Sequence, residues 1–150
     1  MPPMFDEGIA PLDEDECLAL IGDRGVGRVA VSIGAVPAVF PVNYGLLDGT
    51  VVFRTGSGTK LDAAVHNAVV AFEVDDIDPL YHEGWSVLVV GLADEIRDPA
   101  LLARAEHLPV RPWAPGPREH VVAIRPEFVS GRRIVHDARH SPPRAGDDGR

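Results

Sequence analysis

The residue types best suited to chemistry lie in one short loop, Arg54-Thr55-Gly56-Ser57-Gly58-Thr59-Lys60. The apolar residues of 50–53 before it indicate a strand, and the apolar residues of 61–68 after it recur at helical spacing. This succession suits phosphate, because backbone N–H groups at a glycine-rich turn and the dipole of the following helix both attract an anion. Arg54 and Lys60 can add ion pairs. The loop therefore predicts a phosphate-binding site.

The order of residues in this loop excludes two common nucleotide motifs. A Walker A loop requires Gly-Lys followed by Ser or Thr, whereas this loop has Gly58-Thr59-Lys60, and no third glycine completes a dinucleotide fingerprint. A purely structural interpretation stays open. In it, Thr59 caps the helix with Asp62 as its capping-box partner, and Arg54 and Lys60 are solvated charges. Asp62 also opposes an anion, which favours this alternative.

The other reactive side chains form weaker patterns, and no catalytic triad or dyad is present. Cys17 falls on the apolar face of a helix with an acidic first turn, so we expect it to be buried and structural. His136 and His140 have i,i+4 spacing without a third ligand, and no metal site is predicted. The remaining histidines are scattered singly, as surface or packed residues are, although one could be an axial haem ligand. These are His66, His82, His107 and His120.

Composition and charge exclude several classes of protein. The 150 residues suit one domain, and the net charge of −9 disfavours nucleic acid and anionic lipid as partners. The single cysteine cannot form an intramolecular disulfide, which fits a reducing compartment. Residues 1–11 carry acids where a signal peptide would be basic, and no apolar run is long enough to span a bilayer. We therefore expect a cytoplasmic protein with neither nucleic-acid nor membrane partners.

The elements that would position the loop are mostly short strands joined by hairpins. Alternating apolar residues and turn signals predict six strands, at 27–33, 36–44, 50–54, 69–74, 85–96 and 120–125. Helices are expected after the capping residues Asp13, Thr59 and Asp98. Six short strands with a few short helices predict a mainly β fold, a six-stranded antiparallel barrel. The barrel domain is expected over 1–136, with a disordered tail over 137–150.

Three details of these strands carry further predictions. Pro37 and Pro41 cannot donate ladder hydrogen bonds, so their strand should lie at an edge or a bulge. Gly91 is a position where a bulge costs little. The run Val87-Leu88-Val89-Val90 is apolar on both faces, so one face needs a cover from outside its own barrel. A second copy in a twofold dimer is the simplest cover.

Several segments together carry a resemblance to a known family. They are Val39-Phe40-Pro41-Val42-Asn43-Tyr44, Phe53-Arg54-Thr55 with Gly58-Thr59-Lys60, Gly84-Trp85-Ser86-Val87-Leu88-Val89-Val90-Gly91, Pro112-Trp113-Ala114-Pro115-Gly116 and Val129-Ser130-Gly131-Arg132-Arg133-Ile134. In order and spacing the chain resembles the pyridoxamine 5′-phosphate oxidase-like flavin-binding split barrels, in the branch that also contains the nitroimidazole-resistance proteins. The resemblance covers 12–135. It implies a homodimeric split β-barrel.

The resemblance also implies a cofactor site at the dimer interface. FMN would have its phosphate at Thr55, Thr59 and Lys60, with the isoalloxazine against the backbone of 41–43. The strand with Trp85 and Ser86 would belong to the other subunit; Trp85 and Trp113 could instead be core or interface anchors. The full set of implied cofactor-binding residues is Pro41, Val42, Asn43, Arg54, Thr55, Ser57, Gly58, Thr59, Lys60, Trp85, Ser86 and Trp113.

The resemblance implies only a broad class of activity, although it implies individual site residues. The chain is shorter than the true pyridoxamine phosphate oxidases and lacks a match to their substrate-binding arginine and histidine, so vitamin B6 oxidation is not expected. The first hypothesis is an FMN-dependent oxidoreductase that transfers a hydride to or from an unidentified small molecule. Related barrels use F420 or bind haem, so the alternatives are an F420-dependent reductase or a non-catalytic flavin, F420 or haem carrier. A dimeric barrel with an empty site is the third hypothesis.

Overall fold

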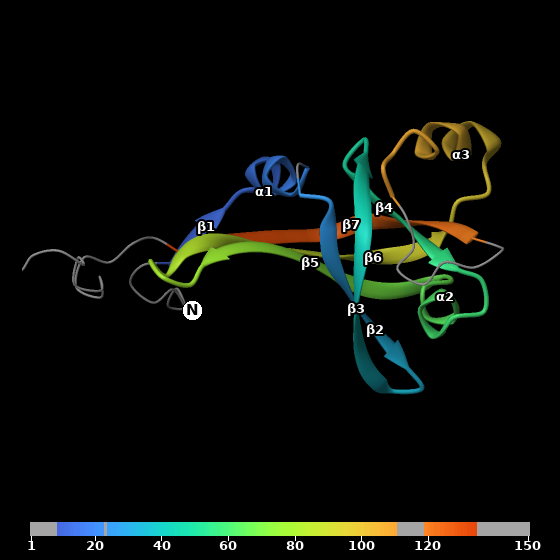
Figure 1. Ribbon diagram of the computed structural model, residues 1–150, viewed down its shortest axis with the longest axis horizontal. Helices are drawn as coiled ribbons and strands as arrows, with labels where there is room; N and C mark the ends of the chain where they lie inside the picture. Colours follow the sequence, from blue (N-terminus) through green and yellow to red (C-terminus); the bar gives the residue numbers. More distant parts are fainter. Residues whose placement is uncertain (1–8, 23, 111–118, 135–150) are drawn as a thin grey trace, which may run out of the picture.

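Among the residues that the computed structural model describes, 9–22, 24–110 and 119–134, seven antiparallel strands form one sheet (Figure 1). Their order is β1-β7-β4-β3-β2-β5-β6, and a further pairing of β6 with β7 closes six of them into a barrel. The strands are β1 (Ile9–Leu12), β2 (Val26–Ile33), β3 (Val36–Leu47), β4 (Thr50–Gly56), β5 (Ala68–Asp78), β6 (Glu83–Glu95) and β7 (Glu119–Ile134). The mainly β, split-barrel class is as expected.

The prediction of six strands was wrong in number, because β1 is a seventh strand outside the closed ring. It pairs with the far end of β7, from Ile9 opposite Ile134 to Leu12 opposite Gly131. Four residues that include a proline show no alternation of their own, so this strand exists only because a distant segment offers it an edge. For the same reason β7 extends well past Arg125, where its sequence pattern ends.

In the described part of the chain, three short helices begin at the capping residues that the sequence predicts. They are α1 (Glu14–Ile21), α2 (Lys60–Ala64) and α3 (Pro99–Ala105). The side chains of Asp13, Thr59 and Asp98 accept hydrogen bonds from backbone N–H groups in the first turn, at 2.8, 3.1 and 3.0 Å. Each bond satisfies a donor that the helix itself leaves without a partner. No helix in the described residues is long and apolar enough to cross a membrane.

The proline-bearing half of β3 lies at a local edge of the sheet, as predicted. Residues 36–43 pair with β2, whereas β4 pairs only with the residues from Tyr44 to Leu47. Pro37 and Pro41 therefore need no donor on the side away from β2. Figure 1 shows this half of β3 and β2 projecting from the barrel as a two-stranded hairpin. The bulge expected at Gly91 is also present, as a register shift between Val90 and Gly91.

The barrel interior is filled by apolar side chains from all six ring strands, with Phe53 and Phe72 fully buried. The rings of Tyr44 and Phe72 pack edge to face, with their centres 4.9 Å apart. The Tyr44 hydroxyl donates a hydrogen bond to the carbonyl of Ile21 at the end of α1. Cys17 is fully buried, as expected. Burial, followed by the nearby Asp13, Glu16 and Glu14 carboxylates, raises the pKa of its thiol. Cys17 is therefore a packing residue.

Candidate functional site

The predicted phosphate loop joins the end of β4 to α2, at the end of the molecule away from β1 (Figure 1). Thr55 and Gly56 are buried in it, whereas Ser57, Gly58 and Lys60 are exposed. Gly58 has φ +81°, which disfavours other residues there. The loop thus presents a cation and a sharp turn to solvent.

The carboxylate of Asp62 accepts hydrogen bonds from the donors that a bound anion would otherwise use in this loop. Thr55 Oγ1 donates to Asp62 Oδ1 at 2.7 Å, and the Gly58 N–H donates to Oδ2 at 3.2 Å. Asp62 is only 6% exposed. The capping-box prediction is therefore wrong in its second half: Thr59 caps the helix, but Asp62 binds Gly58, and the Thr59 N–H donates to the Gly56 carbonyl.

Two histidines that looked isolated in the sequence converge on the same carboxylate. Asp62 Oδ1 lies 2.7 Å from His120 Nδ1 and 3.4 Å from His66 Nε2, and the two imidazole rings are 5.5 Å apart. Asp62 lies on α2, and His66 lies just after it, four residues further along the chain. This i,i+4 spacing is visible in the sequence and could have predicted their contact. His120 is 58 residues away, and the pairing of β7 with β4, which sets it opposite Thr55, brings it here.

The electrostatics of this cluster favour a charged pair. Burial would raise the pKa of Asp62, but hydrogen bonds from His120, Thr55 and the Gly58 N–H outweigh it, so the pKa lies below its usual range. The hydrogen bond to Asp62 raises the pKa of His120, against a smaller opposing effect of burial. The other nitrogen of His120, Nε2, lies 3.9 Å from Glu95 Oε1. His120 therefore connects the buried carboxylate to β6.

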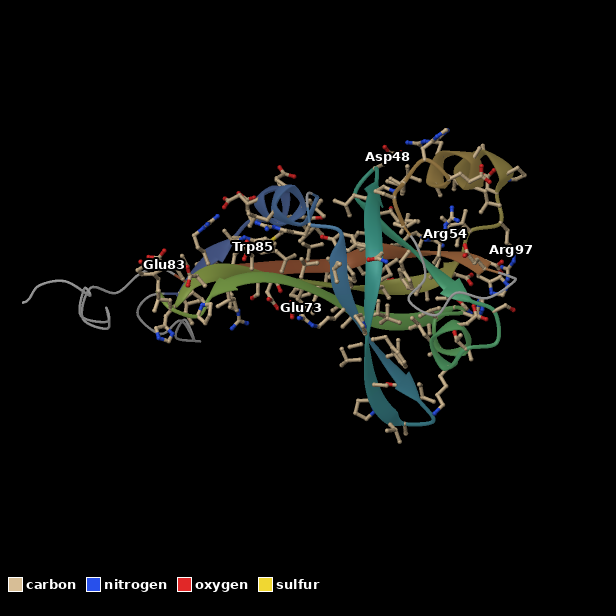
Figure 2. All side chains as sticks on the ribbon, viewed as in Figure 1. Asp48, Arg54, Glu73, Glu83, Trp85 and Arg97 are labelled. Carbon is tan, nitrogen blue, oxygen red and sulfur yellow. The ribbon has the colours of Figure 1, made fainter. Side chains whose placement is uncertain are left out.

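Arg54 lies on the opposite face of β4 from Thr55, because successive side chains of a strand alternate. Its Nη1 is 3.2 Å from Glu119 Oε2, whereas its Nε is buried and has no hydrogen-bond acceptor among the described residues. Such an orphaned donor is costly unless a ligand supplies the acceptor. Figure 2 shows Arg54 at the end of the molecule that also carries Asp48 and Arg97.

A cavity of about 430 Å³ lies on this outer face of β4, within the size range of small-molecule sites. Six apolar and six charged side chains line it together with Thr50, and four of the charged groups are carboxylates. They come from the β3–β4 turn, strands β4, β6 and β7, the segment after β6, and α3. The lining includes Val52, Leu92, Asp94, Glu95, Leu101, Ala123 and Arg125. Glu95 belongs both to this wall and to the surroundings of His120. The cavity and the Asp62 cluster are therefore neighbours.

Trp85 and Ser86 lie far from the loop within one chain. Trp85 pairs with Arg133 near the end of β7, whereas Arg54 pairs with Val121 near its start. Twelve residues of strand separate these positions by about 40 Å. Figure 2 shows the two labelled side chains toward opposite ends of the sheet. Trp85 is 5% exposed, with the Arg24 guanidinium 5.5 Å from its ring centre. Only a second subunit could bring these residues to one ligand.

The backbone of 41–43, predicted to face the isoalloxazine ring, lies next to the point where β3 and β4 separate. Their ladder ends at the pair Tyr44 and Phe53, so Asn43 and Arg54 are the first residues beyond it. Val42 is 3% exposed and packs into the core, whereas Pro41 is exposed. The structure thus brings these residues near the start of the loop. Trp113 and the 137–150 tail lie outside the described residues.

Comparison with known proteins gives consistent results along most of the chain. Residues 13–133 match the family model described as pyridoxamine 5′-phosphate oxidase. An uncharacterized protein of Mycobacterium tuberculosis, Rv0080, is 42% identical over 142 residues, 91% of this chain and 93% of the relative. A solved FAD binding protein from Mycobacterium smegmatis is 37% identical, with a TM-score of 0.76 over 85% of this chain and 100% of that chain. A putative pyridoxamine 5′-phosphate oxidase from Corynebacterium glutamicum is 28% identical, with a TM-score of 0.73 over 89% of this chain and 98% of that chain. On this sequence and structural agreement, the chain belongs to the pyridoxamine 5′-phosphate oxidase family.

Proposed function

We propose that this protein is a homodimeric flavoprotein that binds a flavin nucleotide in the cavity on the outer face of β4 and transfers a hydride to or from a small molecule. The observation that carries the proposal is Arg54, whose buried Nε has no acceptor among the described residues and whose strand lines the cavity. A ligand with anionic or carbonyl oxygens would supply that acceptor. The family assignment supports the same conclusion.

The phosphate of the flavin nucleotide would be held by cationic side chains more than by the loop's inner donors. Asp62 already accepts from the Thr55 hydroxyl and the Gly58 N–H, so these residues, with Thr59, keep the loop in shape. Lys60 is exposed at the start of α2, and it is the only lysine in the sequence. We assign the charge that neutralises the phosphate to Lys60 and Arg54, with Ser57 as a further donor.

A twofold dimer would complete the site. Ala30, Ala71, Val90 and Phe128 stand directly opposite one another across β2, β5, β6 and β7, on the outer face of the barrel. Phe128 is 57% exposed, an unusual state for a large aromatic side chain in the middle of a strand. With a partner on this row, Trp85 and Ser86 of the partner subunit would be the copies that reach the site, because they lie about 40 Å from it within one chain.

The chemistry comes from the flavin, which accepts or donates a hydride at N5 of its ring system. The protein's part is to bind, orient and exclude water. The apolar part of the cavity wall, with Val52, Leu92 and Ala123, suits a flat aromatic ring. Arg97 and Arg125 bring positive charge to a wall that also carries four carboxylates. This division of work requires no catalytic acid or base from the chain.

FMN is the first candidate for the flavin, and FAD is the second. The FAD candidate is favoured by the 37% identical protein of Mycobacterium smegmatis, whose name states that it binds FAD. F420 and haem are the remaining candidates, which the resemblance of the sequence raised. A non-catalytic carrier of the same cofactor is the alternative to an oxidoreductase.

The direct test is an absorbance spectrum of the purified full-length protein, followed by titration with FMN, FAD, F420 and haemin. We expect a flavin spectrum, or saturable quenching of flavin fluorescence, with one flavin per chain. Reduction of the bound flavin by NADH or NADPH, followed by reoxidation with an added acceptor, would distinguish an oxidoreductase from a carrier. Saturable binding of F420 or haemin with no affinity for either flavin would overturn the proposal.

A further inference from the structure

We propose that Asp62, His66 and His120 form a binding site for a divalent transition-metal ion. One ligand atom from each residue lies within 4.8 Å of the other two. Asp62 Oδ1 is 2.7 Å from His120 Nδ1 and 3.4 Å from His66 Nε2. Ligand atoms about 2.0–2.1 Å from a tetrahedral zinc ion are about 3.3 Å apart, so small side-chain shifts would accommodate a metal.

The types of ligand select the class of metal. Two imidazoles and one carboxylate suit Zn²⁺, Co²⁺, Ni²⁺ or Fe²⁺, whereas Mg²⁺ and Ca²⁺ prefer oxygen ligands. Asp62 brings the negative charge, and the two histidines bind as neutral imidazoles. A net positive charge would remain on the ion. Three protein ligands leave a position for water or an anionic oxygen, which is the pattern of open metal sites.

The surroundings of Asp62 already resemble those of a metal ligand. Thr55 Oγ1 and the Gly58 N–H hold its carboxylate in place, as supporting hydrogen bonds do around metal-bound carboxylates. His120 Nε2 faces Glu95 Oε1 at 3.9 Å, a partner that would orient the imidazole. The Asp62 side chain is 9% exposed, whereas those of His66 and His120 are 32% and 29% exposed. The site is therefore anchored in the core and reachable from solvent.

A second pair of histidines in this chain could also bind a metal ion, and the experiment must exclude it. His136 and His140 have i,i+4 spacing near the C-terminus and lie outside the described residues. Their double substitution, His136→Ala with His140→Ala, controls for metal bound there. His107→Ala controls for the loss of an exposed histidine elsewhere.

The test is a titration of the untagged, chelator-treated full-length protein with Co²⁺, read by its visible absorption bands, and with Zn²⁺, read by calorimetry. We expect one equivalent of metal to bind to the wild type. His66→Ala and His120→Gln should each weaken binding at least tenfold, and both controls should bind as the wild type does. Asp62→Asn also disturbs the loop, so His66→Ala, which leaves the bond between Asp62 and His120 in place, is the decisive variant.

Three outcomes would overturn the proposal. They are the absence of stoichiometric binding by the wild type, binding unchanged in His66→Ala, and binding lost in the His136 and His140 double variant. Circular dichroism of each variant establishes that it is folded. Flavin titration of the same metal-free proteins is a separate measurement. If none of these proteins binds flavin while the wild type still binds Co²⁺, the proposed function is overturned and the metal site is supported.

Discussion

His120 Nδ1 lies 2.7 Å from Asp62 Oδ1, and this contact ties the first residues of β7 to helix α2. Asp62 in turn holds the loop between β4 and α2 through Thr55 and Gly58. One carboxylate therefore fixes three segments that are far apart in the sequence. Its loss should affect the barrel's stability as well as any ligand bound beside it.

Replacing His120 should lower stability in a pH-dependent manner. The folded-state pKa of His120 lies above its usual 6.5, chiefly because of the hydrogen bond to Asp62, so its contribution is complete below about pH 6.5. The contribution is lost as pH rises through the folded-state pKa. The pKa of Asp62 is lowered, so that carboxylate stays charged at pH 6. In chelator, His120→Gln should lower the free energy of unfolding by about 1–3 kcal/mol at pH 6, and by less at pH 9.

Urea unfolding of the wild type and His120→Gln at the two pH values checks this prediction. His107→Gln, on an exposed residue, serves as the control. An equal loss of stability at pH 6 and pH 9 would show that His120 contributes packing without charge.

Removing the positive charge of Lys60 should weaken flavin binding. Lys60→Ala is expected to cost about 1.5–3 kcal/mol of binding free energy, the loss typical of a hydrogen bond to a charged group. Lys60→Arg, which keeps the charge, should lose much less. Because Lys60 is the only lysine in the sequence, amine acylation followed by peptide mass spectrometry can read its accessibility directly. Flavin should protect Lys60 from acylation; equal labelling with and without flavin would contradict the phosphate assignment.

A charge placed on the outer row should separate the subunits. Phe128→Asp puts a carboxylate on the face made by Ala30, Ala71, Val90 and Phe128, where a partner would have to bury it. We expect sedimentation velocity to show a dimer for the wild type and a monomer for this variant, with weaker flavin binding. Leu80→Asp, at an exposed residue between β5 and β6, should stay dimeric. A wild-type monomer would refute the dimer.

Adding one methyl group at Gly91 should disrupt the bulge that lets β6 close on β7. A Cβ there would lie 1.8 Å from the Arg125 carbonyl oxygen, so the backbone of one strand must move. Gly91→Ala should destabilise the barrel by about 3 kcal/mol. Thermal unfolding measures the effect, with Gly22→Ala as the control, because a Cβ at Gly22 meets nothing closer than 3.5 Å. Equal unfolding midpoints for the two variants would contradict this account.

Neutralising Glu73 should stabilise the protein at alkaline pH. Burial, followed by the hydrogen bond and the charge of Asp75, raises the pKa of Glu73 from 4.5 to about 7, against the attraction of Arg28. Ionising this group therefore costs folding free energy, and the cost grows as pH rises from about 4.5 through about 7. Glu73→Gln should raise the thermal unfolding midpoint at pH 8 and leave it nearly unchanged at pH 4.5. The exposed Glu106→Gln is the control, and a rise of the midpoint at pH 4.5 as large as that at pH 8 would contradict the assignment.

Features set by neighbouring residues could be predicted from the sequence. The capping residues Asp13, Thr59 and Asp98 each bind a donor two or three residues ahead, so the pattern alone locates the helix starts. The prolines of β3 and the bulge at Gly91 follow from the covalent chemistry of single residues. The family resemblance, spread over most of the chain, was confirmed by the match over 13–133.

Features that depend on register between distant strands were decided only by the tertiary structure. The pairing of β4 with β7 sets Thr55 opposite His120 and thereby assembles the cluster around Asp62. The same pleat turns Arg54 to the outer face of β4 and Thr55 to the inner face, although they are adjacent in the sequence. β1 likewise exists because the end of β7 offers it an edge. Sequence patterns report local neighbours, whereas these contacts join segments that meet only once the barrel has closed.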